Sequence, residues 1–242
     1  MTGYEALEGV IDNVEVPLLQ ARGVRKAFGP TCALRQADVT VSAGEIVAVM
    51  GPSGSGKSTL LHCLAGILAP DEGEVVFSGR RVDRLNEEQR AALRRTDFGF
   101  VFQFGQLLGE LSVVENVALP LLLNGVRRGK AMAIAREWLE MFDLADLALR
   151  RPHEVSGGQA QRVAIARAMA TSPKIIFADE PTGSLDSAAG VTVLDSFTAV
   201  ARSRGVAIVL VTHESRVAAY ASRMIVVRDG VVTAPAAAEW SR

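Results

Sequence analysis

The sequence predicts an α/β fold in which helices cover both faces of a mainly parallel β-sheet. Short, continuously apolar runs alternate with helical segments, as expected when each strand is buried on both faces. One such run, Glu45–Met50, ends abruptly in the glycine-rich segment GPSGSGKST. Another, Ile175–Ala178, ends in two carboxylates, Asp179 and Glu180. Parallel strands that end in polar loops are typical of α/β domains with a site at one sheet edge.

Length and composition narrow the class of protein. The 242 residues suit one large domain or a domain with a modest insertion. An apolar share of 49% is enough for a substantial core and excludes a disordered chain. The net charge of −1 argues against a nucleic-acid partner. Cys32 and Cys63 form no CxxC pair, so we expect reduced thiols in the core.

No segment is expected to enter a membrane directly. A spanning helix needs about 18–20 continuous apolar residues, and the best runs, Val117–Leu123 and Val206–Val211, are far shorter. No lysine or arginine precedes Arg22, and the start of the chain has no apolar core of a secretion signal. We therefore expect a soluble intracellular protein that reaches a membrane only through a partner.

Hydrophobic periodicity predicts the order of the elements. The acidic residues 1–15 suit either a short arm helix or a frayed tail. Strands are expected over 16–24, 37–41, 45–50, 74–77, 98–102, 175–178, 207–212 and 224–227. Helices are expected over 60–68, 113–124, 131–142, 159–170 and 190–203, with a short one before 224. These patterns predict one domain over 16–233, with a helical lobe inserted at about 104–165 and a tail over 234–242.

The glycine-rich segment predicts a site for a nucleoside triphosphate. It fits the pattern G-x-x-x-x-G-K-[ST] between a strand and a helix. Its glycines let backbone N–H groups surround an anion, and the helix that follows adds a favourable dipole. Lys57 is expected to reach the β- and γ-phosphates, and Ser58 to place its hydroxyl on Mg²⁺. The predicted binding residues are Gly51, Pro52, Ser53, Gly54, Ser55, Gly56, Lys57, Ser58 and Thr59.

The two carboxylates after Ile175–Ala178 predict the second half of that site. Asp179 is expected to hold the metal, directly or through water. Glu180 is placed to orient and polarise a water molecule for in-line attack on the γ-phosphate. This pair favours hydrolysis over a GTPase scheme that uses glutamine, and the sequence has no NKxD base-reading motif.

A third segment, Ser156-Gly157-Gly158-Gln159, would by itself indicate only a turn or a helix cap. With the other two segments, in this order, it resembles the signature of the ATP-binding subunits of ABC transporters. Further matches follow the same order: Phe28 in RKAFG, Gln103 in FVFQ, the loop Gly183–Asp186 and His213 in VLVTH. The resemblance extends from about residue 16 to 232.

The resemblance implies a fold and a mechanism. The fold is a P-loop NTPase core with an N-terminal antiparallel β portion and an inserted helical lobe. Two ATP molecules with Mg²⁺ would lie between the subunits of a head-to-tail homodimer. Each would contact the glycine loop of one subunit and Ser156–Gln159 of the other, with Asp186 linking the two sites. Phe28 would stack on adenine, and Gln103 would contact Mg²⁺ or the attacking water.

The resemblance also implies a partner and a switch. His213 would hold Glu180 and contact the γ-phosphate. Gln103 would respond to an integral-membrane permease, which would keep the chain on the cytoplasmic face of the cell membrane.

The arginines Arg162 and Arg167 and the pair 150–151 are expected to be solvated or structural.

Segments such as ENVALPL and ADEPTGSLD resemble one branch of this family, which serves lipoprotein release, macrolide or peptide export, and cell division. Val155, Ala160 and Gly109 depart from the residues common there, at positions outside the expected chemistry. The leading interpretation is the ATPase subunit of an exporting or extracting complex. A division-type regulatory ATPase that moves no substrate remains an alternative. A soluble relative acting on ribosomes or DNA is a third reading, although one glycine loop and no long insertion argue against it.

Overall fold

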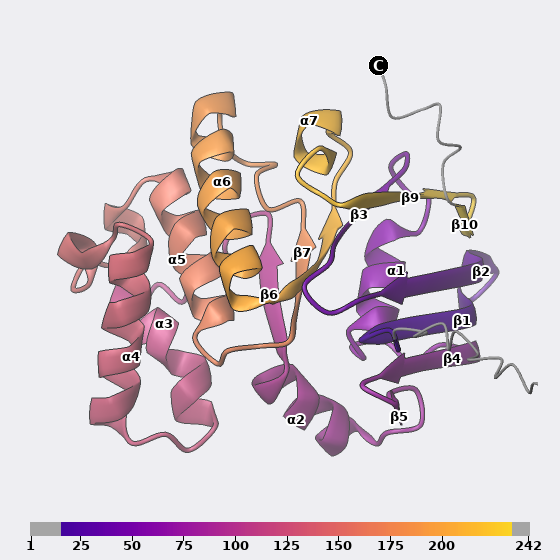
Figure 1. Cartoon of the computed structure of the whole chain (residues 1–242), viewed down its shortest axis with the longest axis horizontal. Helices are drawn as coiled ribbons and strands as arrows, with labels where there is room; N and C mark the ends of the chain where they lie inside the picture. The colour runs from indigo at the N-terminus through magenta and orange to yellow at the C-terminus, as the bar shows by residue number, and fades with distance from the viewer. Residues whose placement is uncertain (1–15, 234–242) are drawn as a thin grey trace, which may run out of the picture.

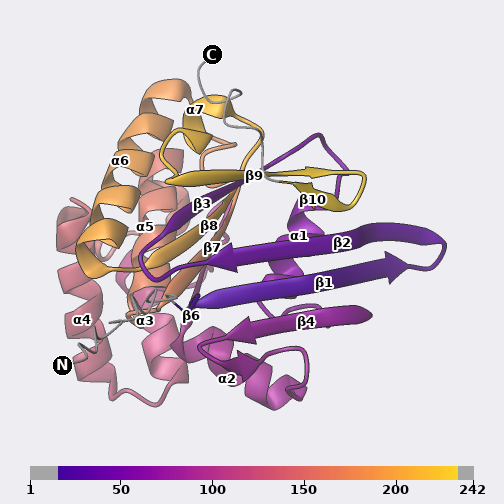
Figure 2. The same cartoon turned by 45° about the vertical axis from the view of Figure 1, so that its right-hand side comes forward.

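The computed structural model describes residues 16–233, so the predicted arm and tail lie outside the described residues. A ten-stranded sheet has the order β5-β4-β1-β2-β10-β9-β3-β8-β7-β6 (Figures 1 and 2). The strands are β1 Leu19–Phe28, β2 Thr31–Val41, β3 Ile46–Met50, β4 Glu72–Phe77, β5 Arg80–Arg81, β6 Phe98–Phe102, β7 Ile175–Asp179, β8 Ala207–Val211, β9 Arg223–Arg228 and β10 Val231–Thr233. The α-helices are α1 Lys57–Leu64, α2 Glu87–Thr96, α3 Val113–Leu123, α4 Arg128–Met141, α5 Gly157–Met169, α6 Ser187–Arg204 and α7 Ser215–Ala218.

The parallel half of the sheet confirms the predicted α/β class. Strands β9, β3, β8, β7 and β6 run parallel to one another, with pairs such as Val49↔Val211 and Asp179↔Val211 in register. Every residue of β8 is buried. Because parallel strands end at the same edge, the loops after β3, β7 and β8 gather there.

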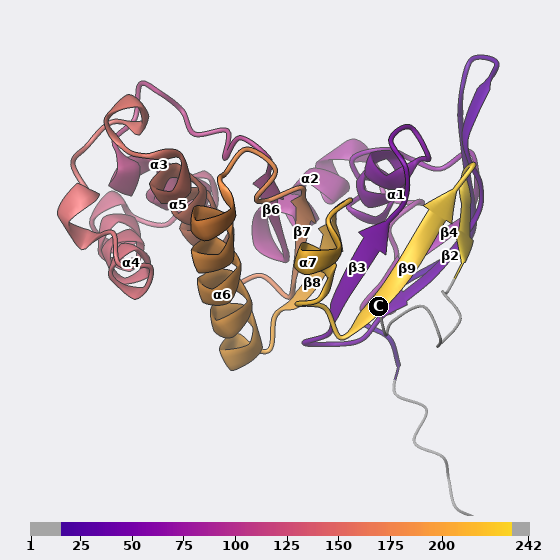
Figure 3. The same ribbon diagram turned by 90° about the horizontal axis from the view of Figure 1, so that it is seen from above.

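An antiparallel portion stands beside it, as the family resemblance implied. Strands β1 and β2 form a hairpin, and β1 also pairs with β4. Strand β10 joins the two portions, since it is parallel to β2 and antiparallel to β9. Seen from above, β2 and β4 lie at one end of the molecule and α3, α4 and α5 at the other (Figure 3).

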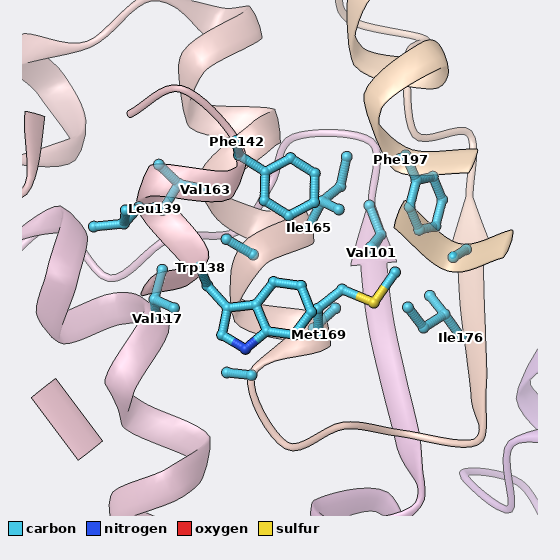
Figure 4. Packing of buried hydrophobic residues seen from close by; sticks show 14 of the residues in the cluster. Val101, Val117, Trp138, Leu139, Phe142, Val163, Ile165, Met169, Ile176 and Phe197 are labelled. Atoms are coloured by element: carbon cyan, nitrogen blue, oxygen red, sulfur yellow. The ribbon is translucent and has the colours of Figure 1, made fainter. Parts of the chain in front are cut away.

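Two hydrophobic clusters lie on the two faces of the parallel strands. Along β7, Ile176 and Ala178 join one cluster, while Ile175 and Phe177 join the other, which is the period of two expected for a strand. The first cluster packs Trp138, Phe142 and the apolar side of α5 against β6, β7 and α6 (Figure 4). Each large side chain buried in this way contributes about 1.5–3 kcal/mol of transfer free energy.

One α-helix and two strands were not predicted, and several boundaries were wrong; β2, for example, begins at Thr31 rather than at residue 37. Helix α2 is rich in charged residues and fully buries none of its side chains, although Leu93 packs against one of the clusters. Its sequence signal is the capping box of Asn86 and Gln89. The two short strands β5 and β10 were also missed. Strand β1 runs on to Phe28, past the predicted end at residue 24. Helix α1 ends at Leu64 rather than 68, because Gly66 takes the left-handed conformation and turns the chain.

Within residues 16–233, no helix is both long and apolar enough to cross a bilayer. Of the two cysteines expected in the core, Cys63 is fully buried and Cys32 is only half-buried.

Candidate active site

The glycine-rich loop after β3 has the tight backbone that its sequence predicted. Gly51, Gly54 and Gly56 all have positive φ, at 147°, 77° and 108°. A Cβ atom on Gly51 would lie 2.1 Å from the carbonyl oxygen of Val227, so this turn excludes any side chain. Gly56 begins α1 without a side-chain cap, which leaves N–H groups of the first turn available to an anion.

Two side chains of this loop are arranged for a ligand. The ammonium of Lys57 lies 2.9 Å from the carbonyl oxygen of Gly51 and 2.8 Å from that of Pro52, so it reaches back over the loop. The buried hydroxyl of Ser55 has no hydrogen-bond partner among the described residues. The Lys57 ammonium, the backbone N–H groups of the loop and the unsatisfied Ser55 hydroxyl are together suited to bind a polyphosphate.

Glu180 and His213 meet at the carboxyl ends of β7 and β8. The Nδ1 atom of His213 lies 2.9 Å from Oε1 of Glu180. Glu180 has a φ of 47°, a conformation unfavourable for a side chain of this kind. Its backbone N–H donates to the carbonyl of Val211, and its carbonyl accepts from Gly183. The surrounding loops therefore hold Glu180 in a strained conformation and aim its carboxylate, a pattern common at functional sites.

Asp179 precedes it in a more buried position. Burial raises the pKa of the Asp179 carboxyl above its usual range, and a hydrogen bond from Ser58 opposes this shift. The contact also connects the end of β7 with the start of α1. The oxygen atoms of Ser58 and Asp179 are thus neighbours, as a shared metal ligand set requires.

Gln103 follows β6 and lies beside these residues. Ser58, Gln103, Asp179 and Glu180 line one cavity of about 340 Å³. A Cβ atom on Gly183 would lie 2.9 Å from Nε2 of Gln103 and 3.2 Å from Oε2 of Glu180, so the loop after Glu180 touches both side chains. The fold therefore brings together four residues from three distant parts of the sequence.

Phe28 ends β1 at the tip of the β1–β2 hairpin. Its ring is 50% exposed, which excludes a core position and leaves a face open. The ammonium of Lys26 lies 5.7 Å from the ring centroid. The glycine loop adjoins this hairpin, because a Cβ atom on Gly56 would lie 2.4 Å from the carbonyl oxygen of Ala33.

The signature residues lie apart from this cavity. Ser156 and Gln159 form a capping box at the start of α5, with Gln159 N–H donating to the Ser156 hydroxyl. Gly157 and Gly158 allow close packing against the segment that contains Asp186, which caps α6 through the N–H groups of residues 188 and 189. These five residues line a separate groove of about 390 Å³ that shares no residue with the cavity of Glu180.

An apolar groove of about 490 Å³ opens between α2, β6, α3 and α5. Leu123 and Ile67, with exposed fractions of 64% and 38%, stand at this groove together with Phe102 and Arg167. This groove could not be predicted from the sequence, because its residues come from separate parts of the chain. Nor did the sequence single out Ser184, whose hydroxyl donates to the carbonyl of Gln103 at 2.6 Å.

Comparisons with known proteins identify the family of the chain. A family model described as "ABC transporter" matches residues 34–183. The chain belongs to the ABC transporter family. As the ATP-binding cassette of that family, it is an ATPase subunit of a transporter.

Individual relatives cover nearly the whole chain. An ABC transporter ATP-binding protein of Methanocaldococcus jannaschii is 44% identical over 89% of this chain and 97% of its own length. The lipoprotein-releasing system ATP-binding protein LolD 2 of Caulobacter vibrioides is 44% identical, with 88% and 96% covered. The macrolide export ATP-binding/permease protein MacB 1 of Aeromonas hydrophila is 45% identical over 90% of this chain, which matches 34% of that longer protein.

A solved ATP-binding cassette, in a dimeric post-hydrolysis state with ADP and Pi, has 38% identity and a TM-score of 0.80 over 88% of this chain and 96% of its own. This likeness confirms the predicted ABC ATPase fold.

The buried carboxylate of Asp179 should cost stability when the site holds no cation. Burial raises the pKa of the Asp179 carboxyl in the folded protein above its value in the unfolded chain. Ionisation of this carboxyl at neutral pH therefore favours unfolding. We expect Asp179→Asn to raise the melting temperature at pH 7 in EDTA by about 2–4 °C, the scale of a modest stabilisation in a domain of this size. Calorimetry with and without MgATP tests this, because MgATP should stabilise the parent more than the variant. A lower melting temperature in EDTA would contradict the prediction.

Proposed function

We propose that Glu180 is the general base of ATP hydrolysis, and that two copies of this chain share two ATP molecules. The observation that carries this proposal is the contact of 2.9 Å between Glu180 and His213, beside Asp179 and the glycine loop. A carboxylate at this position, held in a strained backbone, is suited to orient a water molecule.

The chemistry follows from these positions. The water attacks the γ-phosphorus in line with the leaving group and passes its proton to the Glu180 carboxylate. The bond from the γ-phosphorus to the β–γ bridging oxygen breaks, which leaves ADP and inorganic phosphate. The Lys57 ammonium stabilises negative charge on the β- and γ-phosphates. His213 holds the carboxylate of Glu180 by donating from Nδ1, and its Nε2 would donate to a γ-phosphate oxygen when the ring carries both protons.

Ser58, Asp179 and Gln103 would hold Mg²⁺. A hydroxyl, a carboxylate and an amide carbonyl are oxygen donors of the kind that Mg²⁺ prefers, and the three residues line one cavity. When bound, Mg²⁺ neutralises charge on the phosphate oxygens. Phe28 would stack on the adenine through its open face.

The signature residues support a site shared between subunits. Ser156–Gln159 line a groove separate from the cavity of Glu180, so within one chain they are not part of the site that Glu180 serves. In a head-to-tail dimer they would meet the γ-phosphate bound by the partner's glycine loop. The helix start at Ser156 suits an anion, and Asp186 lies in the same groove. The solved relative is a dimer with ADP and Pi.

The apolar groove at Leu123 would receive a cytoplasmic helix of an integral-membrane permease. Relatives named as lipoprotein-releasing and macrolide-export proteins support such a partner. The chain would then lie on the cytoplasmic face of the membrane and drive release or export of a lipoprotein, peptide or hydrophobic compound. The domain would span 16–233, with its helical lobe at about 104–165.

Glu180→Gln should bind ATP yet turn it over about 10²–10⁴-fold more slowly, since an amide keeps the shape of the side chain but cannot accept the proton. Phosphate release, measured with saturating MgATP, tests the rate, and titration with a fluorescent ATP analogue tests the affinity. Glu137→Gln, at an exposed position of α4, is the matched control and should retain the parent rate. A parent rate in Glu180→Gln would show that another group is the base.

Ser156→Arg should abolish ATP-dependent dimerisation while each subunit still binds ATP at its own glycine loop. The Glu180→Gln single variant should sediment as a monomer without nucleotide and as a dimer with MgATP. The added Ser156→Arg should keep it monomeric. The control Ser203→Arg, near the C-terminal end of α6 and outside the groove of Ser156, should still dimerise.

A mixing experiment, with Glu180 intact, then separates the two halves of the site. Lys57→Ala and Ser156→Arg subunits should each be inactive alone, but a mixed dimer contains one intact site and should regain part of the activity. A Ser156→Arg protein that still dimerises with MgATP would rule out the shared site.

Leu123→Glu should weaken binding of the permease, because it places a charge in an apolar groove. A tagged chain is purified from detergent-solubilised membranes, and the co-purifying multi-helix membrane protein is identified by mass spectrometry. Its recovery should fall with Leu123→Glu but not with Leu149→Glu, at a position 81% exposed and outside the groove. Equal recovery with both variants would place the contact elsewhere.

A further inference from the structure

The loop that carries Gln103 is held by side chains from outside it. Along residues 102–106, the carbonyl of Phe102 accepts from Nε2 of Gln161 at 2.9 Å. The carbonyl of Gln103 accepts from the Ser184 hydroxyl at 2.6 Å. The carbonyls of Gly105 and Gln106 both accept from Arg167, at 2.7 Å and 2.8 Å. Gln161 and Arg167 both belong to α5, the helix that begins at the signature.

The backbone of this loop takes an unfavourable shape to make these contacts. Gly105 and Gln106 have φ values of 66° and 47°, and the second is costly for a residue with a side chain. A Cβ atom on Gly105 would lie 3.4 Å from the carbonyl oxygen of Ala160, so the loop rests directly on α5. This shape turns two successive carbonyls toward one guanidinium.

Arg167 is well suited to this contact. Its two terminal nitrogens form a rigid fork that can meet two oxygens at once. Burial lowers the pKa of the guanidinium, and no carboxylate of residues 16–233 forms an ion pair with it. The charge is therefore balanced by backbone carbonyl dipoles of the Gln103 loop rather than by an acid.

Packing alone does not explain a cation at this position. Its neighbours Ala166 and Ala168 are buried, and the apolar side of α5 is anchored by Ile165 and Met169. A neutral side chain would avoid the cost of burying charge. Arg167 also lines the apolar groove, so it lies between that groove and the loop of Gln103.

We propose that Arg167 is a positioning residue for hydrolysis: it fastens the Gln103 loop to the signature helix and so keeps Gln103 beside Ser58, Asp179 and Glu180. Ser184, in the loop that follows Glu180, also holds the Gln103 loop through the carbonyl of Gln103. The sequence indicated only a solvated or structural role for Arg167. The inference rests on the role of Gln103 in the proposed function.

The test compares Arg167→Met, which keeps a long apolar stem, with Arg167→Lys, which retains a charge and can serve one carbonyl. We expect kcat to fall about 10–100-fold in Arg167→Met, the scale of a small misplacement in an active site, with KM for ATP unchanged. Arg167→Lys should restore part of kcat. Arg202→Met is the matched control, because it also removes an arginine bond to a carbonyl, that of Tyr220, away from the site.

Hydrogen exchange measured by mass spectrometry provides a readout independent of activity. In Arg167→Met, the peptide that contains residues 102–106 should exchange faster, while the peptide of the glycine loop should not. Ser184→Ala should increase exchange in the same peptide without disturbing α5. These variants keep the test valid if Arg167→Met folds poorly.

The possible outcomes distinguish a failure of the positioning role of Arg167 from a failure of the proposed role of Gln103. A parent kcat in Gln103→Ala would remove the role proposed for Gln103 itself. A lowered kcat in Gln103→Ala, together with parent exchange and parent kcat in Arg167→Met, would overturn the positioning role alone. An Arg167→Met protein whose kcat and KM change equally, with faster exchange throughout the chain, would show a structural role only.

Discussion

The parallel pairing of β3, β8 and β7 is the constraint on which the site depends. It brings their carboxyl ends to one edge, so the glycine loop, the Asp179–Glu180 pair and His213 meet although they are far apart in the chain. The strands can pair in this way because both of their faces are covered by apolar clusters. The cost of burying strand backbone is offset by the ladder of hydrogen bonds and by the apolar side chains on both faces.

Two strained non-glycine positions lie where the chemistry is expected. Glu180 and Gln106 both take left-handed backbone conformations, and the glycine loop has three glycines that do so. These conformations persist because neighbouring strands and helices supply partners for the turned backbone groups. The ordinary parts of the fold therefore support a small region that would not take this shape by itself.

The helix α5 connects three surfaces of the molecule. It begins at the signature residues, carries Arg167 beneath the Gln103 loop and forms one wall of the apolar groove. A rigid element that touches all three can transmit a displacement from any one of them to the others. Its apolar side is fixed in the cluster of Trp138 and Phe142 (Figure 4), so α3 and α4 would move with it.

The sequence by itself determined the α/β class, the glycine loop, the carboxylate pair and the family, because these depend on local patterns of apolar runs and spacing. It also placed β6 at its observed bounds, Phe98–Phe102, and α3 to within one residue. The tertiary structure alone decided the contact of Glu180 with His213, the exposed ring of Phe28 and the separation of the signature groove from the cavity of Glu180. It alone showed that Arg167 contacts two backbone carbonyls, since a half-buried arginine and a solvated one have the same sequence signal. Helix α2 was missed because its sequence is rich in charged residues and has few apolar ones, so the capping residues Asn86 and Gln89 are its clearest signal.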